Sequence, residues 1–220
     1  MKTALSWSSG KDSAWALHLL RQRRDVEIGA LITTFNKSTD RVAMHGVRRG
    51  LVRQQASMVG LPLWEIELPW PCPNEEYESL MASVCKRAAE EGFSGMAFGD
   101  LFLRDIREYR EKQLAGTGLE AVFPLWDFPT AELAQEMIAS GLRAKLTCID
   151  LRKLDPGFAG RDFDTALLQD LPSGVDHCGE NGEFHTFVYA APVFRQPVAV
   201  KCSDIVECDG FVFADVTKEE

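Results

Sequence analysis

Hydrophobic and polar positions follow two alternating periods along the first 125 residues. Short apolar runs with branched side chains are typical of buried strands, and they alternate with longer stretches whose apolar residues recur at helical spacing. The expected strands are 1–7, 26–35, 63–68 and 95–100, and the expected helices begin at residues 13, 46, 74 and 103. Alternation of this kind predicts βαβ units and a Rossmann-like, doubly wound parallel sheet with helices on both faces.

The pattern changes after residue 125. One further helix at 130–139 and a strand at 143–149 are followed by a loop-rich region. From residue 184 to residue 216 the chain is rich in Val, Phe and Tyr and is interrupted by prolines and by Asp209-Gly210, which is typical of antiparallel strands and hairpins. The sequence therefore predicts an α/β domain at 1–125 and a smaller α+β domain at 126–220.

Composition and charge restrict the class of protein. The 220 residues carry a formal net charge of −9, which argues against a long nucleic-acid track because phosphate binding needs a concentrated basic face. The clusters Arg21, Arg23, Arg24 and Arg48, Arg49, Arg53 are interpreted as solvated helix surface. The N-terminus lacks the pattern of a signal peptide, no apolar run is long enough to span a membrane, and the six cysteines form no C-x-x-C pair. A cytoplasmic protein with reduced thiols is expected.

The segment Ser8-Ser9-Gly10-Lys11-Asp12-Ser13 lies between a predicted strand and a predicted helix. Backbone N–H groups at such a helix start, with a lysine beside them, can bind phosphates. The Walker A pattern fails twice, because Leu5 stands where its first glycine is required and Asp12 where Ser or Thr is required. A carboxylate at residue 12 suits a pyrophosphate accompanied by Mg²⁺. The alternative is that Ser8 or Ser9 caps the helix while Lys11 and Asp12 are exposed, and the residues alone leave both interpretations open.

A second group of polar residues occupies 176–186, where Glu180 and Glu183 bracket Asn181-Gly182. Two nearby carboxylates can bind Mg²⁺, orient ammonia or act as a base. A polar turn entering a strand is the plain structural alternative. A zinc site is a third option, although the spacing of His, Cys and Glu here matches no familiar ligand set.

Taken together, the two segments carry a resemblance to a known family. The first is similar to the Ser-Gly-Gly-Lys-Asp-Ser loop of the PP-loop ATP pyrophosphatases, with Ser9 in place of a glycine; this departure matters if the position needs a positive φ. The second resembles the Gly-Glu-Gly-Gly-Glu-Tyr/Phe signature of the diphthine–ammonia ligase family within that superfamily, with Asn181 replacing a glycine. Met44-His45-Gly46, Gly99-Asp100 and Pro124-Leu125-Trp126 agree with the same family, and the likeness extends over about residues 2–190.

The resemblance implies a HUP-type domain that binds ATP and Mg²⁺, followed by a substrate domain. ATP would be cut between its α and β phosphates to adenylate a carboxylate substrate, and ammonia would then displace AMP to leave an amide. The implied nucleotide-binding residues are Ser8, Ser9, Gly10, Lys11, Asp12, Ser13, His45, Gly99 and Asp100. Lys11, Glu180 and Glu183 would be catalytic, and Asp12 and Asp100 would hold Mg²⁺.

The substrate and two competing functions stay open at this point. The carboxylate substrate is either the diphthine side chain of an elongation factor or another metabolite. Free ammonia is the expected nitrogen donor. The oligomeric state is open, and a homodimer is one option. A PP-loop enzyme that thiolates tRNA would need catalytic cysteines, for which Cys85 and Cys178 are a distant pair. A non-catalytic adenine-nucleotide-binding protein would leave Glu180 and Glu183 without a purpose.

Overall fold

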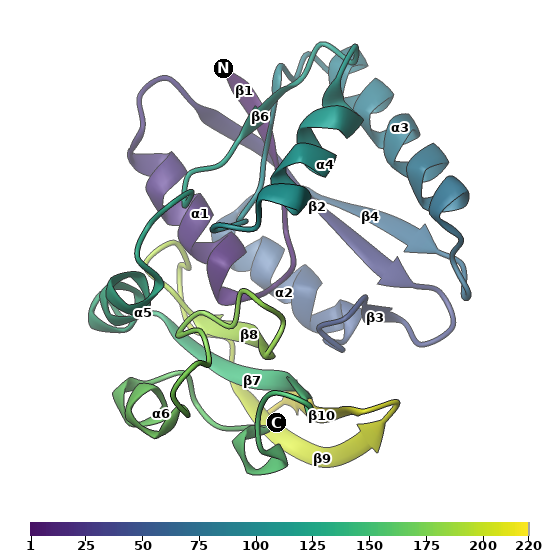
Figure 1. The fold of residues 1–220 in the computed structure, drawn as a ribbon. Coiled ribbons are helices and arrows are strands. Elements are labelled where there is room, and N and C mark those ends of the chain that lie inside the picture. Colours follow the sequence, from purple (N-terminus) through teal and green to yellow (C-terminus); the bar gives the residue numbers. More distant parts are fainter. Residues whose placement is uncertain (220) are drawn as a thin grey trace.

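The chain forms a parallel sheet covered by helices and a separate antiparallel sheet, as a computed structural model describes them for residues 1–219 (Figure 1). The predicted α/β fold with a smaller second domain is confirmed. The first sheet has the spatial order β4-β2-β1-β5-β6, and a short antiparallel strand, β3, pairs with the end of β2. Its strands are β1 (Lys2–Ser6), β2 (Glu27–Asn36), β3 (Arg41–Val42), β4 (Leu63–Leu68), β5 (Gly95–Ala97) and β6 (Glu120–Val122).

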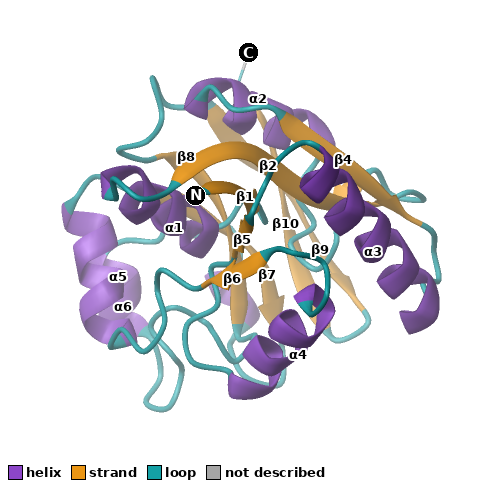
Figure 2. Ribbon diagram, turned by 90° about the horizontal axis from the view of Figure 1, so that it is seen from above, coloured by secondary structure: helices purple, strands orange, loops and turns teal. Residues whose placement is uncertain are grey.

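Four helices cover this sheet on two faces (Figure 2). They are α1 (Lys11–Gln22), α2 (Arg49–Val59), α3 (Asn74–Glu90) and α4 (Arg104–Leu114). Buried residues of α1 and α2 pack in one hydrophobic cluster with Leu5 and Phe35, whereas those of α3 pack in a second cluster with Ala4 and Met96. Neighbours in β1 fall in different clusters because successive strand residues point to opposite faces.

Three predicted helix starts differ from the structure: α1 begins at Lys11 rather than at residue 13, and α4 begins at Arg104 rather than at residue 103. Gly46 has a φ of +66° and the backbone of Arg48 is extended, so α2 begins at Arg49 rather than at residue 46. The predicted start at residue 74 is confirmed, because Asn74 is the first residue of α3; Pro73 takes the N-cap position, and no side chain caps the helix.

The second sheet has the order β8-β7-β10-β9, with every neighbouring pair antiparallel. Its strands are β7 (Arg143–Asp150), β8 (Phe184–Ala190), β9 (Val200–Cys208) and β10 (Phe211–Lys218). Helix α5 (Thr130–Ala139) links it to the first sheet, and a 3₁₀ turn, η1 (Pro156–Phe158), and helix α6 (Thr165–Asp170) lie between β7 and β8.

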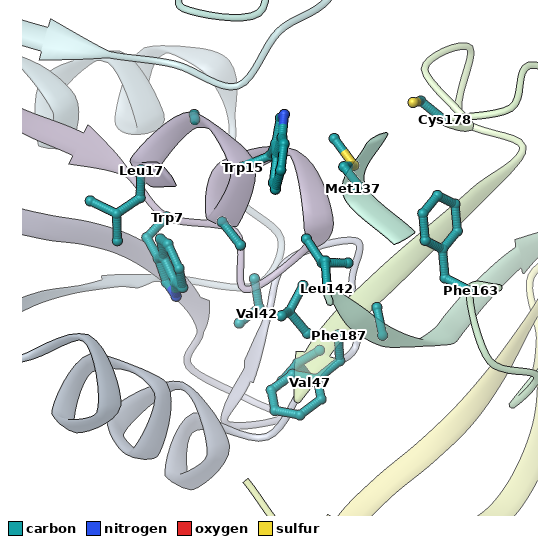
Figure 3. Packing of buried hydrophobic residues seen from close by; sticks show 14 of the residues in the cluster. Trp7, Trp15, Leu17, Val42, Val47, Met137, Leu142, Phe163, Cys178 and Phe187 are labelled. Carbon is teal, nitrogen blue, oxygen red and sulfur yellow. The ribbon is translucent and has the colours of Figure 1, made fainter. Parts of the chain in front are cut away.

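The two sheets share one hydrophobic core (Figure 3). The cluster that contains Trp7 and Trp15 of the first part continues to Met137 of α5 and Phe187 of β8. At the surface, Asp215 of β10 accepts hydrogen bonds from Arg41 and Arg48, each of which also forms an ion pair with it. The packing therefore fixes the second sheet against the carboxyl ends of the first. None of the helices in residues 1–219 combines the length and the apolar character that crossing a membrane requires.

Candidate active site

A cavity of about 430 Å³ lies where the strands of the parallel sheet end and the second sheet begins. Open α/β sheets bind ligands at this edge, and the volume is in the range of small-molecule sites. The predicted site residues that line it are Ser8, Lys11, Asp12, Ser13, His45, Gly99, Asp100 and Glu180. The predicted residues Ser9, Gly10 and Glu183 lie outside this lining. The cavity therefore brings the loop 8–13 and one glutamate of the distant motif together.

Lys11 is the buried cation at the start of α1. Only 2% of the residue is exposed, and its Nζ donates to Asp12 Oδ2 at 3.0 Å and to the backbone carbonyl of Cys178. Burial alone would lower the pKa of Lys11, but the charge of Asp12 and of other acidic groups raises it above its ordinary value. Lys11 is therefore a fixed positive charge in the cavity, and it links the loop to the second domain.

Three carboxylates, those of Asp12, Asp100 and Glu180, line the cavity together with Lys11. Burial raises the pKa of Asp12 and of Asp100, and it raises the pKa of Glu180 to about 7, with the charge of Asp12 adding to the effect. Asp12 Oδ1 and Asp100 Oδ2 are buried and have no hydrogen-bond partner. Such unsatisfied oxygens are costly in an apolar surrounding and are suited to a cation.

The donor set fits Mg²⁺ better than zinc. Within residues 1–219, no group of three or more His, Cys, Asp and Glu side chains is arranged to hold a metal ion by itself. Magnesium is ordinarily held by one or two carboxylates together with substrate phosphates and water, whereas structural zinc needs four protein ligands. The unpartnered oxygens of Asp12 and Asp100 match the magnesium case.

The second domain contacts the loop directly through β8. The N–H of Lys11 donates to Thr186 Oγ1 at 3.0 Å, and the N–H of Val188 donates to the carbonyl of Ser9 at 3.0 Å. A Cβ on Gly10 would lie 3.1 Å from a ring carbon of His45 and 3.2 Å from the carbonyl oxygen of Thr186. Glycine at residue 10 thus permits the close approach of β8.

Ser9 has the left-handed backbone conformation that favours glycine. Its φ is +70°, the residue is fully buried, and its hydroxyl has no hydrogen-bond partner. The left-handed region is strained for residues with a Cβ. The departure from glycine at this position therefore has a structural cost.

Gly99 permits β5 to end against the beginning of α1. A Cβ there would lie 3.0 Å from the carbonyl carbon of Asp12 and 3.1 Å from the nitrogen of Ser13, which are backbone atoms that cannot rotate away. We expect Gly99→Ala to lower the free energy of unfolding by about 1–3 kcal/mol, the usual cost of overpacking, and to weaken MgATP binding by displacing the loop. Chemical denaturation and calorimetric titration measure both effects.

Gly50 supplies the matched control for this substitution. It lies inside α2, and a Cβ added there would have no atom within 4 Å. Gly50→Ala should raise stability by up to about 1 kcal/mol and leave nucleotide binding unchanged. A Gly99→Ala protein with the stability and MgATP affinity of the natural chain would contradict the packing argument.

The motif 176–183 forms a tight loop that presents Glu180 and buries Glu183. Glu180 Oε1 accepts the N–H of Leu101 at 2.8 Å, so the glutamate reaches across to the segment after β5. Glu183 is 3% exposed; its Oε1 accepts the N–H of Asp176 and the side-chain amide of Asn181, and its Oε2 has no partner. Glu183 thus supports the loop from within, while Glu180 lines the cavity.

Two histidine rings contact each other in a tilted arrangement at the side of the cavity. The rings of His45 and His185 are 4.5 Å apart, and Nδ1 of His45 lies 3.4 Å from the carbonyl of Thr186. Burial lowers the pKa of His185 to about 4, with the charge of Lys11 adding to the effect, and burial beside His185 lowers that of His45 well below 6.5. Both imidazoles are therefore neutral near pH 7.

Sequence reasoning did not assign a site role to His185, Thr186 or Arg110, which all line the cavity. His185 and Thr186 directly follow the glutamate motif, so their position next to it was a usable signal. Arg110 stands in a charged helix among other basic residues and carried no signal of its own.

Comparison with known proteins agrees with this architecture. A family model described as the diphthamide synthase N-terminal domain matches residues 1–120, and one described as the diphthamide synthase C-terminal domain matches residues 129–218. The chain belongs to the diphthamide synthase family. The two matches fall on the parallel and the antiparallel sheet respectively.

Curated members of the family are named as ligases. The chain is 30% identical over 151 residues to a diphthine–ammonia ligase of Bos taurus, a match that covers 66% of this chain and 56% of that protein. It is 28% identical over 177 residues to a diphthine–ammonia ligase of Danio rerio, covering 73% of this chain and 69% of that one. The match thus spans little more than half the length of the bovine relative.

Proposed function

We propose that the protein is an ATP-dependent ligase that converts a carboxylate into an amide with ammonia, releasing AMP and pyrophosphate. The observation that carries this proposal is the position of Glu180, which reaches from the second domain into the cavity that Lys11, Asp12 and Asp100 line. Magnesium on a nucleotide is ordinarily held by one or two carboxylates, so the third is available for another step. The names of the curated relatives support the same reaction class.

The phosphate loop would bind the pyrophosphate part of ATP. Lys11 supplies a fixed positive charge, and the first-turn N–H groups of α1 at Asp12 and Ser13 have no acceptor within the helix. A substrate carboxylate oxygen then attacks the α-phosphorus, the bond to the β-phosphate breaks, and an acyl-adenylate forms. Magnesium held by Asp12 and Asp100 would supply further charge neutralisation on the phosphates when bound.

Glu180 would serve the second half of the reaction. Ammonia attacks the acyl carbon, AMP departs with the bonding electron pair, and the nitrogen must lose a proton. A carboxyl with a pKa of about 7 is suited to accept that proton near neutral pH. The carboxylate substrate itself is either a diphthine-type side chain or a small metabolite acid.

A thiolation chemistry is less well supported by the cavity. Cys85 and Cys178 both line it, and both are free thiols. Burial raises the pKa of each thiol, whereas a catalytic cysteine needs a lowered one.

The test is a screen of carboxylic acids with MgATP and ¹⁵N-labelled ammonium. The proposal predicts AMP, pyrophosphate and a ¹⁵N-labelled amide in equal amounts with at least one acid. Release of ADP and phosphate instead would refute α–β cleavage.

Glu180→Gln gives the corresponding variant prediction. Glutamine keeps an oxygen for the N–H of Leu101 but cannot accept a proton. We expect amide formation to fall by about 10²–10⁴-fold, the usual contribution of a general base, with MgATP affinity within a few-fold of the natural chain. At a constant concentration of free NH₃, the natural chain should gain activity as pH rises through about 7, when Glu180 loses its proton, and the variant should lack this rise. An unchanged pH profile in Glu180→Gln would remove Glu180 from the proton transfer.

A further inference from the structure

Arg110 of α4 is a second cation in the cavity, and its hydrogen-bonding capacity is unused. Its guanidinium lies over the ring of Phe98, 5.0 Å from the centroid. The guanidinium forms an ion pair with Asp100, whose Oδ2 lies 3.7 Å from Nε, beyond hydrogen-bonding distance. Nε is buried without a partner, and across residues 1–219 the guanidinium donates no hydrogen bond. A planar group with five donors is therefore held in place while its donors stay free.

The contacts place Arg110 between the phosphate loop and the apolar part of the cavity. Gly99 packs against the start of α1, so Asp100 lies next to the loop, close enough to Asp12 for the two charges to interact. Arg110 lies beside Asp100 and on Phe98, which belongs to the hydrophobic cluster under α3. Ile32, Met96 and Leu114 belong to the same cluster as Phe98 and also line the cavity, together with Met81 and the polar Thr34, Tyr77 and Gln113.

ATP has the same order of groups along its length. The pyrophosphate part is highly charged at one end, and the flat adenine base at the other end makes mainly apolar contacts through its faces. The ribose and the α-phosphate lie between these two ends. If the pyrophosphate part is at Lys11 and the base is in the apolar part, the α-phosphate is the anion that comes to Arg110. Placing the α-phosphate at Arg110 rests on one part of the proposed function, namely that the cavity binds ATP.

We propose that Arg110 binds the α-phosphate and holds the AMP part of the nucleotide, while Lys11 holds the pyrophosphate part. Arginine pairs with phosphate oxygens through two parallel hydrogen bonds and keeps its charge at all working pH values. Stacking on Phe98 and the charge of Asp100 fix its orientation. With this division, pyrophosphate can depart from Lys11 while Arg110 keeps the acyl-adenylate in place for ammonia.

If Arg110 binds the AMP part and Lys11 the pyrophosphate part, substitutions of the two residues should affect the affinities for AMP and for inorganic pyrophosphate differently. Both probes are titrated by calorimetry in the presence of Mg²⁺. Arg110→Gln should weaken AMP and MgATP at least 10-fold and leave pyrophosphate within 2-fold. Lys11→Met should weaken pyrophosphate at least 10-fold and AMP much less. Loss of pyrophosphate affinity in Arg110→Gln equal to the loss of AMP affinity would overturn the division.

Arg107 gives a matched control one turn earlier on the same helix. It lies over the rings of Phe123 and Trp126, bonds Glu111 and does not line the cavity. Arg107→Gln should leave all three affinities unchanged. Should Arg110→Gln fail to fold, Arg110→Lys keeps a charge beside Asp100 but loses the planar pair of donors, and it should still weaken AMP by about 3–10-fold.

Two outcomes separate this inference from the ligase proposal. If Arg110 bound a substrate carboxylate instead, AMP affinity would be unchanged in Arg110→Gln, and the inference would be wrong even if the ligase reaction were observed. If the AMP and pyrophosphate split is measured but no acid yields an amide, the ligase proposal fails and the role of Arg110 stands.

Discussion

Lys11→Met is expected to destabilise the protein by about 3–5 kcal/mol and to reduce MgATP affinity by about 100-fold or more. Methionine has a similar length but no charge, so the half-buried Asp12 loses the ammonium at 3.0 Å and the carbonyl of Cys178 loses its donor. Removing one partner of a buried ion pair leaves the other charge uncompensated, which carries a cost of this size. Urea denaturation and calorimetric titration with MgATP measure the two effects.

The double variant Lys11→Met/Asp12→Asn separates stability from binding. Neutralising Asp12 removes the uncompensated charge, so most of the lost stability should return. Nucleotide affinity should not return, because the positive charge and one candidate Mg²⁺ ligand are both absent. Recovery of MgATP binding in the double variant would show that Lys11 acts only as a partner for Asp12.

Ser9→Gly is expected to make the protein more stable, by about 2 kcal/mol. Glycine removes the left-handed strain, worth about 1–2 kcal/mol, and it removes a buried hydroxyl that has no partner, worth about 1–3 kcal/mol, against some lost packing. For a chain of this size the change corresponds to a rise in melting temperature of about 4–8 °C. Nucleotide affinity should be unchanged, because Ser9 does not line the cavity.

Ser9→Ala divides this gain into its two causes. Alanine removes the hydroxyl but keeps a Cβ at a φ of +70°. It should therefore recover only the part of the gain that comes from the unpaired hydroxyl and stay below Ser9→Gly. A melting temperature for Ser9→Gly at or below that of the natural chain would mean that the serine hydroxyl is satisfied in solution.

The regular part of the fold could be predicted because its pattern is local. Strand β4 and helix α5 occupy the expected residues, since each combines clear periodicity with a proline or glycine boundary. Strands β3 and β6 have only two and three residues, which is too few to show a period-2 alternation in the sequence. Their backbones are held in strand conformation by pairing with β2 and β5. Helix α6 was missed although Asp164 caps it by accepting the N–H of Leu167, a signal that the sequence does contain.

The candidate site was predictable where a short motif carries the chemistry and not where tertiary contacts do. Lys11 and Glu180 stand in such motifs, and they meet although 169 positions separate them in the sequence. Glu180 and Glu183 look equivalent in the sequence, but only the fold shows that one faces the cavity and the other the loop interior. Asn181 also replaces a glycine, yet unlike Ser9 it has no positive φ and donates its amide to Glu183.

The central claim is that a carboxylate oxygen attacks the α-phosphorus of ATP and forms an acyl-adenylate. An isotope label tests this claim most directly. The acid that the screen identifies is prepared with both carboxylate oxygens as ¹⁸O and turned over with MgATP and ammonium. Adenylation predicts one ¹⁸O in AMP and one in the amide, because the oxygen that attacks phosphorus leaves with AMP. An ¹⁸O found in inorganic phosphate, with none in AMP, would contradict the account.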